Sequence, residues 1–255
     1  MPLVLVTIPC RTDNYTYLIH DAGTGATAVI DVPETAPILA ALKARGWQLT
    51  DILITHHHSD HIDGVNELRA ATGAKVTGAS ADAHRLPPLD LSVAEGDTVK
   101  VGAEAGTVLD VSGHTLGHIA YHFPASGLVF TADSLMACGC GRLFEGTAET
   151  MWRSLSKLAR LPPDTLVCSG HEYTASNIRF ALSLEPRNAA LISRAAGVTE
   201  ARQKGLPTVP SRLSEELATN PFLRASLPSM KAEVGMADAA DAAVFGEIRA
   251  RKDRF

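Results

Sequence analysis

The chain has 255 residues, 45% of them hydrophobic and 20% charged, so it is long and apolar enough to bury a large core. This composition excludes a disordered chain, and four cysteines are too few for a disulfide scaffold. The 23 Lys and Arg against 28 Asp and Glu give a net charge of -5, which argues against nucleic acids and anionic membranes as partners and favours a small molecule.

The sequence also bears on where the protein works. No apolar run approaches the roughly 18 residues of a membrane helix, and no basic segment precedes the apolar start Met1-Pro2-Leu3-Val4-Leu5. We therefore expect a soluble, unsecreted protein of the cytoplasm with reduced cysteines and no membrane partner. The sequence does not settle the oligomeric state, and a monomer is the working expectation.

Short β-rich segments alternate with turns along the first two-thirds of the chain. Apolar and β-branched runs predict strands at Val4–Ile8, Tyr15–His20, Ala28–Asp31, Asp51–Thr55, Lys75–Gly78, Thr98–Val101, Gly106–Val111, Ile119–Phe123, Gly127–Thr131 and Thr165–Ser169. Helical spacing predicts helices at 34–45, ending at Gly46, and at Glu149–Leu161, which Pro162-Pro163 closes.

From about Tyr173 the composition shifts to Ala, Arg and Glu, and strand-like runs vanish. Helices are predicted at Ala175–Ala196, Ser211–Ala218 and Ala239–Arg254. We therefore expect an α/β domain at 1–173 followed by an all-helical domain at 174–255.

The strongest chemical signal directly follows the predicted strand that ends at Thr55. His56, His58, Asp60 and His61 are grouped within six residues, at offsets typical of metal ligands. On an extended segment His56 and His58 project to one side, while Asp60 and His61, at the start of the next helix, face a second ion. A solvated polar loop would explain one or two histidines but not this cluster.

Three isolated candidates each follow another predicted strand, namely His114, Asp133 and His171. Alone, each would more often be a hydrogen-bonded structural residue than a ligand. Together with the first motif they complete two sites. One site would combine His56, His58 and His114, the other Asp60, His61 and His171, with Asp133 bridging the two ions. Mixed His and Asp ligation suits two divalent ions, with zinc the first choice and iron or manganese as alternatives.

Other residues of the ligand types are not predicted to bind metal. His57 lies between ligands and should point away, and Gly117 before His118 indicates a turn rather than a helical ligand pair. Cys138 and Cys140 are flanked by glycines, which favours packing or loop geometry over ligation. Asp31 either orients a ligand histidine or caps the following segment, and the sequence leaves both open.

The metal motif with its downstream ligands resembles the metallo-β-lactamase superfamily, and further motifs resemble glyoxalase II, the hydroxyacylglutathione hydrolases, over nearly the whole chain. These further motifs are Thr12-Asp-Asn-Tyr-Thr-Tyr-Leu18, Ala132-Asp-Ser, Gly139-Cys-Gly-Arg-Leu-Phe-Glu-Gly146, Gly170-His-Glu-Tyr-Thr174, Asn220-Pro-Phe-Leu-Arg224 and a basic C-terminal helix. The metal motif defines only the superfamily, whereas the later motifs are more specific to this family.

The resemblance implies an αββα sandwich of two mixed sheets followed by a helical domain, with a dinuclear site that has the same division of ligands. It implies hydrolysis of the thioester S-D-lactoylglutathione to glutathione and D-lactate, a step of methylglyoxal detoxification. No side-chain nucleophile is expected, because the attacking group would be a metal-bridging hydroxide held by Asp60 and Asp133.

By the same resemblance, glutathione would be bound by Arg142, Tyr173, Arg249 and Lys252, with Phe144 close by. Some relatives carry lysine and tyrosine in place of Arg142 and Phe144, so one hydrogen bond to the substrate is in doubt. Without the resemblance, the cations of the C-terminal helix would more simply favour its negative dipole end and solubility.

Three rival functions would each account for part of the sequence. The first is a glutathione persulfide dioxygenase on the same fold, which would not require the complete second site and is disfavoured by His171, Asp60 and the Gly139–Gly146 stretch. The second, nucleic-acid processing, conflicts with the net charge of -5. The third, a non-catalytic metal module, is disfavoured because seven ligands exceed what a closed structural site uses.

Overall fold

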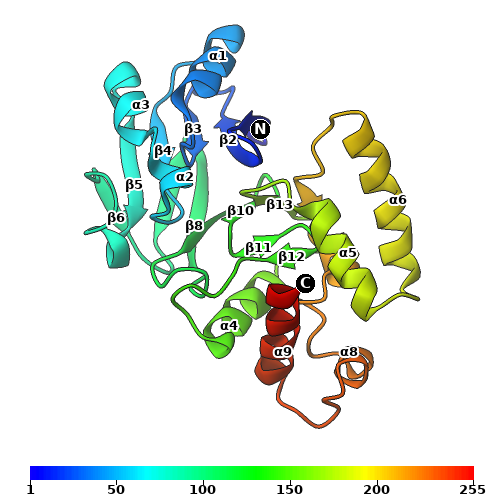
Figure 1. The fold of residues 1–255 in the computed structure, drawn as a ribbon. Coiled ribbons are helices and arrows are strands. Elements are labelled where there is room, and N and C mark those ends of the chain that lie inside the picture. Colours follow the sequence, from blue (N-terminus) through cyan, green and yellow to red (C-terminus); the bar gives the residue numbers. More distant parts are fainter. The chain divides into compact units, whose positions relative to one another are not determined.

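Short strands alternate with helices through the first half of the computed structural model, which describes residues 1–255 (Figure 1). The chain divides into two units. The first unit comprises Met1–Val111 and Leu116–Ala132, and the second comprises Ser112–Thr115 and Asp133–Phe255. The short segment Ser112–Thr115, which carries His114, thus groups with the later part of the chain.

A mixed sheet forms the first layer of the first unit. Its six strands are β1 (Val4–Cys10), β2 (Asn14–His20), β3 (Thr27–Ile30), β4 (Asp51–Leu53), β5 (Lys75–Ala79) and β6 (Leu91–Val93), and they neighbour one another in this order. The pairs from β1 to β3 are antiparallel and those from β3 to β6 are parallel. Parallel neighbours need crossover connections, and these contain α1 (Thr35–Arg45), α2 (Ser59–Ile62), α3 (Val65–Thr72) and a 3₁₀ turn at Ser80–Asp82.

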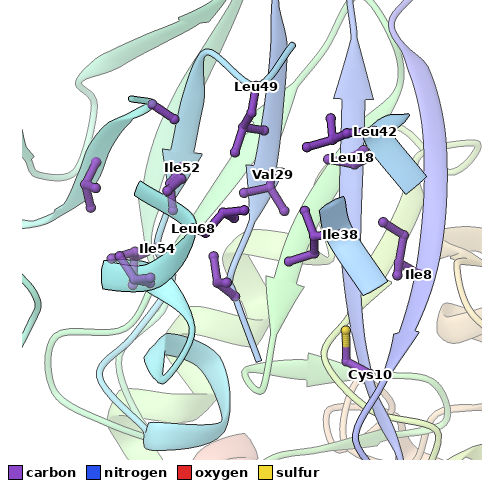
Figure 2. Close-up of a cluster of buried hydrophobic side chains, with 14 residues drawn as sticks. Ile8, Cys10, Leu18, Val29, Ile38, Leu42, Leu49, Ile52, Ile54 and Leu68 are labelled. Atoms are coloured by element: carbon purple, nitrogen blue, oxygen red, sulfur yellow. The ribbon is translucent and has the colours of Figure 1, made fainter. Parts of the chain in front are cut away.

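Helices α1 and α3 cover one face of this sheet and bury an aliphatic core against it (Figures 1 and 2). Ile38 and Leu42 of α1 and Leu68 of α3 contact the same cluster as Val29 and Ile52 of the strands, and none of the five is more than 4% exposed. Each such side chain contributes about 1.5–3 kcal/mol on burial. This core fixes the ends of β3 and β4, and Asp31 and the candidate ligand His56 follow within three residues.

The second layer of the first unit is antiparallel. Its strands β10 (Leu128–Ala132), β9 (Ile119–Phe123), β8 (Glu104–Asp110) and β7 (Thr98–Val101) are neighbours in that order. The two layers face each other, since the Tyr121 hydroxyl donates to the Ile54 carbonyl at 2.8 Å and the Tyr17 and Phe130 rings lie 5.7 Å apart.

The second unit is mainly helical. Its short strands form two antiparallel pairs, β11 (Leu135–Met136) with β12 (Gly139–Cys140) and β13 (Leu166–Ser169) with β14 (Ser211–Arg212). Its helices are α4 (Ala148–Leu158), α5 (Thr174–Leu184), α6 (Ala189–Gln203), α7 (Leu213–Thr219), α8 (Pro228–Glu233) and α9 (Asp241–Arg254). Helix α4 lies beside α9, and α5 beside α6 (Figure 1). None of the helices in either unit is long and apolar enough to cross a membrane.

Most predicted elements are confirmed to within a few residues, but the region after Tyr173 needs correction. The single helix predicted at Ala175–Ala196 is wrong, because the chain leaves α5 at Glu185 and restarts as α6. Pro186 lacks an amide hydrogen and its ring would collide with the preceding turn, and the Asn188 side chain caps α6 by accepting from Leu191 N at 3.2 Å. Strand β14 also contradicts the expectation that no strand follows Tyr173.

Candidate metal centre

The first group of candidate ligands lies in the segment that connects β4 to α2. His56 is fully buried and His58 is half-buried. His56 Nε2 and His58 Nδ1 lie 3.1 Å apart, while the other ring nitrogen of His56, Nδ1, is 3.0 Å from Thr55 Oγ1. Two imidazole nitrogens from one extended segment thus point to the same place, as the alternation of side chains in the sequence predicts.

Asp60 and His61 follow in the first turn of α2. His61 Nδ1 donates to Asp31 Oδ2 at 2.8 Å, which leaves Nε2 for ligation, and Nε2 lies 3.8 Å from Asp60 Oδ2. Asn14 Nδ2 donates to the same oxygen of Asp60 at 3.0 Å. A histidine that donates one ring N–H to a carboxylate while the other nitrogen faces a second ligand is the usual arrangement at metal sites.

Asp31 resolves the alternative that the sequence left open. Both its carboxylate oxygens are used, since Oδ1 accepts from Thr55 N at 2.8 Å and Oδ2 accepts from Thr55 Oγ1 at 2.7 Å as well as from His61. One of these oxygens also lies within 4.8 Å of a ring nitrogen of His56 and of a ring nitrogen of His61. Because both oxygens are already engaged, we assign Asp31 to orienting His61 rather than to ligation. Its φ of 59° is left-handed, an uncommon conformation for a residue other than glycine.

The two neighbouring histidines have hydrogen-bond partners outside the set of candidate ligands. His57 Nδ1 bonds to Asp82 Oδ2 at 3.0 Å, which agrees with the expectation that its ring points away from the ligands. The His118 ring is stacked on His56, with centroids 4.5 Å apart and planes 11° apart, and its Nδ1 lies 3.1 Å from the Ile119 carbonyl oxygen.

The second group belongs to the second unit, where three strand-end loops bring His114, Asp133 and His171 together. Asp133 Oδ2 lies 3.5 Å from His114 Nε2 and 3.3 Å from His171 Nε2. All three residues are buried. One carboxylate oxygen therefore faces two imidazole nitrogens, which is the placement that a bridging ligand needs.

His114 is oriented by a carbonyl group of the same unit. Its Nδ1 donates to the Arg142 carbonyl oxygen at 2.9 Å, so Nε2 is again the nitrogen left for ligation. Gly141 permits this approach, because a Cβ atom there would overlap the Asp133 carbonyl oxygen and lie 2.7 Å from His114 Nδ1. The glycine reflects close packing behind the ligands.

The cysteines near this group are neutral thiols. Burial raises the pKa of Cys138 to about 12 and that of Cys140 to about 11. The Cys138 thiol donates to the Thr219 carbonyl oxygen at 3.4 Å, and Cys140 Sγ lies 3.8 Å from an Arg249 nitrogen. These contacts favour the packing interpretation over ligation, since metal ligation requires the thiolate.

The predicted glutathione-binding cations lie around Asp253 at the end of α9. Arg142 is largely exposed, with Nε 3.8 Å from Asp253 Oδ1, whereas Arg249 is 5% exposed and donates to that same oxygen at 2.9 Å. Lys252 is half-buried over the Phe180 ring. Burial and then the charge of Arg249 lower the pKa of Lys252, as expected for a crowded cationic surface.

The two predicted aromatic contacts each lie against a candidate ligand. The Phe144 ring is edge-on to His114 with centroids 5.2 Å apart, and Tyr173 is stacked on His171 at 4.8 Å. Phe144 is 62% exposed and Tyr173 39% exposed, so both present aromatic surface to solvent beside the histidines. Exposed aromatic surface of this kind is typical of binding sites.

Two family models match the chain in succession. The model described as "Metallo-beta-lactamase superfamily" matches residues 10–171, and "Hydroxyacylglutathione hydrolase C-terminus" matches residues 172–255. A curated protein of Cereibacter sphaeroides named hydroxyacylglutathione hydrolase is 68% identical over 255 residues, which cover 100% of both chains.

Solved structures share the fold. ETHE1 from Myxococcus xanthus gives a TM-score of 0.67 at 27% identity, covering 98% of this chain and 90% of its own. The B3 metallo-β-lactamase BLEG-1 gives a TM-score of 0.67 at 19% identity, covering 86% and 99%. These likenesses confirm the predicted α/β sandwich followed by a helical region.

Proposed function

The chain belongs to the hydroxyacylglutathione hydrolases of the metallo-β-lactamase superfamily, and we propose that it hydrolyses S-D-lactoylglutathione to glutathione and D-lactate. It is an enzyme of the thioester hydrolase class, and methylglyoxal detoxification is its proposed role. The structural observation that best supports this chemistry is the Asp133 oxygen, which lies within 3.5 Å of an imidazole nitrogen of both His114 and His171.

We propose that seven side chains hold two divalent metal ions, zinc first, with iron or manganese as alternatives. The residues are His56, His58 and His114 for one ion, Asp60, His61 and His171 for the other, and Asp133 for both. The donor set fits such ions, because it consists of imidazoles and carboxylates. The hydrogen bonds of His61 and His114 support the assignment, since each ring donates through Nδ1 and keeps Nε2 for ligation.

When bound, the two ions would supply hydroxide at neutral pH and an electrophile for the thioester carbonyl. The protein's own residues fix the geometry in which this happens. Asp31 holds His61, Asn14 holds Asp60, and the Arg142 carbonyl holds His114. No side-chain acid is required for the leaving group, because a thiol with a pKa of about 8.5 departs readily as thiolate.

The substrate contacts follow from charge and shape. Glutathione carries two carboxylates, and we propose that Arg142 and Lys252 bind them while Phe144 and Tyr173 pack against the peptide. Arg249 would contribute its charge from below this surface, since the residue is 5% exposed and its guanidinium already donates to Cys140 O and Asp253. In this proposal residues 1–173 form the catalytic domain and 174–255 complete substrate binding. We also propose that the protein is a monomer and that it works in the cytoplasm.

The test is steady-state hydrolysis of S-D-lactoylglutathione, followed as loss of thioester absorbance. Asp133→Ala should lower kcat by a factor of about 1,000 or more, because its carboxylate serves both ions. Lys252→Ala should raise KM about tenfold, equivalent to about 1.4 kcal/mol, with little change in kcat. Arg251→Ala, on the same helix but bonded to Glu247 and the Val234 carbonyl, is the matched control and should leave both constants unchanged.

Two results would contradict the proposal. Metal-loaded protein that is inactive on the thioester but consumes oxygen with glutathione persulfide would make it a persulfide dioxygenase. Equal KM changes in Lys252→Ala and Arg251→Ala would remove Lys252 from the binding surface and leave a general charge effect.

A further inference from the structure

The motif Asn220-Pro-Phe-Leu-Arg224, which the proposed reaction does not use, lies against the hairpin formed by β11 and β12. Asn220 is fully buried where α7 ends. Its Nδ2 lies 3.1 Å from the Met136 carbonyl oxygen and 3.0 Å from that of Gly139, and its Oδ1 accepts from Phe222 N at 3.0 Å. A single amide therefore binds the carbonyls on both sides of the hairpin turn.

Three further helical side chains bind other backbone groups of this hairpin. Asn177 of α5 donates to the Ala137 carbonyl at 3.1 Å, Glu216 of α7 accepts from Cys138 N at 2.7 Å, and Arg249 of α9 donates to the Cys140 carbonyl at 3.0 Å. The hairpin clamp is the set Asn177, Glu216, Asn220 and Arg249.

The hairpin needs such support for two reasons. Each of its strands has only two residues, and a two-stranded hairpin is marginally stable even when it is longer. Its turn places Cys138 at a φ of 54°, a left-handed conformation that persists in a residue other than glycine only where surrounding contacts enforce it. The clamp provides those contacts.

The two ends of the hairpin lead directly to candidate metal ligands. Asp133 stands two residues before β11. Arg142, two residues after β12, accepts the hydrogen bond from His114 Nδ1 through its carbonyl oxygen. Gly141 N donates to the Ser134 carbonyl at 3.3 Å, so the two ends are tied together beside these ligands. A shift of the hairpin would therefore move Asp133 and the group that orients His114.

The rest of the motif fits the same arrangement. The Phe222 ring lies under the Arg249 guanidinium at 5.1 Å. Arg224 makes a two-pronged ion pair with Glu185 at 2.9 and 2.8 Å, which fixes the segment to the end of α5.

We propose that Asn220 is a positioning residue for the hydrolytic reaction: as the centre of the hairpin clamp it fixes the 133–142 segment, and through it Asp133 and His114. This inference rests on the proposed function, because only there do Asp133 and His114 hold metal. The motif then serves catalysis from a distance, without touching substrate.

The experiment compares Asn220→Ala with Asn188→Ala in the full chain. Asn188 is the matched control because its side chain also makes two backbone hydrogen bonds in the helical region, to Leu191 N and the Ala218 carbonyl, but none to the hairpin. Three quantities are measured for each: the rate of zinc release from zinc-loaded protein to a chromogenic chelator, kcat and KM on S-D-lactoylglutathione, and the melting temperature.

Asn220→Ala should release zinc about tenfold faster and lose roughly 10- to 100-fold in kcat, with KM within about threefold of wild type, as expected for a residue that orients ligands from behind. Asn188→Ala should lower the melting temperature without either change. If Asn220→Ala does not fold, Asn177→Ala removes one bond of the clamp, and it should speed zinc release by a smaller factor.

The proposal is overturned if Asn220→Ala and Asn188→Ala show the same decrease in melting temperature and both keep the wild-type rate of zinc release and the wild-type kcat. Wild type that fails to hydrolyse the thioester would refute the proposed function alone. The role of Asn220 in fixing the metal ligands Asp133 and His114 would still stand if Asn220→Ala then released zinc faster than Asn188→Ala.

Discussion

Replacing Asp31 by asparagine tests how the protein controls the protonation of a candidate metal ligand. Asp31 accepts three hydrogen bonds at 2.7–2.8 Å, from Thr55 N, Thr55 Oγ1 and His61 Nδ1. Asn can keep the bond from Thr55 N, but it then presents an NH₂ donor to His61. That donor favours the tautomer in which His61 Nδ1 accepts, and this tautomer carries its proton on Nε2, the nitrogen needed for the metal.

The expected cost follows from the bond that is lost. A hydrogen bond to a charged group contributes about 1.5–3 kcal/mol, and about 1.4 kcal/mol corresponds to a factor of ten in affinity. Asp31→Asn should therefore lower the affinity for the metal ion bound by His61 by a factor of about 10–100. This is the range found when residues that hydrogen-bond to metal ligands are changed. The assay is competition for zinc against a chelator of known affinity, with the melting temperature of the metal-free protein measured in parallel.

Asp82→Asn is the matched control. Asp82 is also a buried carboxylate bonded to a histidine Nδ1, that of His57, which is not a predicted ligand. Both variants should lower the melting temperature of the metal-free protein, but only Asp31→Asn should weaken zinc binding. Equal zinc affinities in the two variants would refute the role assigned to Asp31, whatever their stability.

Two further predictions use other parts of the chain. In a zinc titration, Gly141→Ala should show no binding, because its Cβ would overlap the Asp133 carbonyl oxygen and lie 2.7 Å from His114 Nδ1. The control Gly197→Ala, which has open space around the added Cβ, should bind zinc like wild type. Hydrogen bonds from Ala103 N, Gly23 N and Thr24 lower the pKa of Asp21 from 3.8 to about 2. The Asp21 carboxylate therefore stabilises the folded state fully above pH 3.8, and this contribution is lost as the pH falls through about 2. The difference in melting temperature between wild type and Asp21→Asn should therefore narrow as the pH is lowered from about 7 to about 3, and a difference that widens would contradict this assignment.

The parts of the site that the sequence predicts best are those encoded locally. His56, His58, Asp60 and His61 lie within six consecutive positions after one buried strand, so their spacing alone indicates which way each side chain points. The isolated candidates follow three separate strands, so no local pattern joins them. The structure brings His114, Asp133 and His171 together within one unit.

The features that sequence reasoning missed or left open depend on contacts between distant residues. The sequence offers two roles for Asp31, and its hydrogen bond to His61, which decides between them, depends on the parallel pairing of β3 with β4. The β11–β12 hairpin escaped because its strands have two residues each, too few for a period to be recognised. Pro186, in contrast, is a local signal for a helix break, but the residues around it have high helix propensity and favour one continuous helix.

Arg249 has structural contacts in addition to the substrate role that the family resemblance implies. The resemblance assigns it to glutathione, yet its side chain is nearly buried, donates to the Cys140 carbonyl and lies over Phe222. Burying a guanidinium carries a desolvation cost, which these partners and Asp253 offset in part. Lys252, three residues along the same helix, is the more accessible cation. Under the proposed function, Lys252 serves the substrate, while Arg249 also supports the segment that orients His114. Loss of Arg249 should therefore change both KM and kcat, whereas loss of Lys252 should change KM alone.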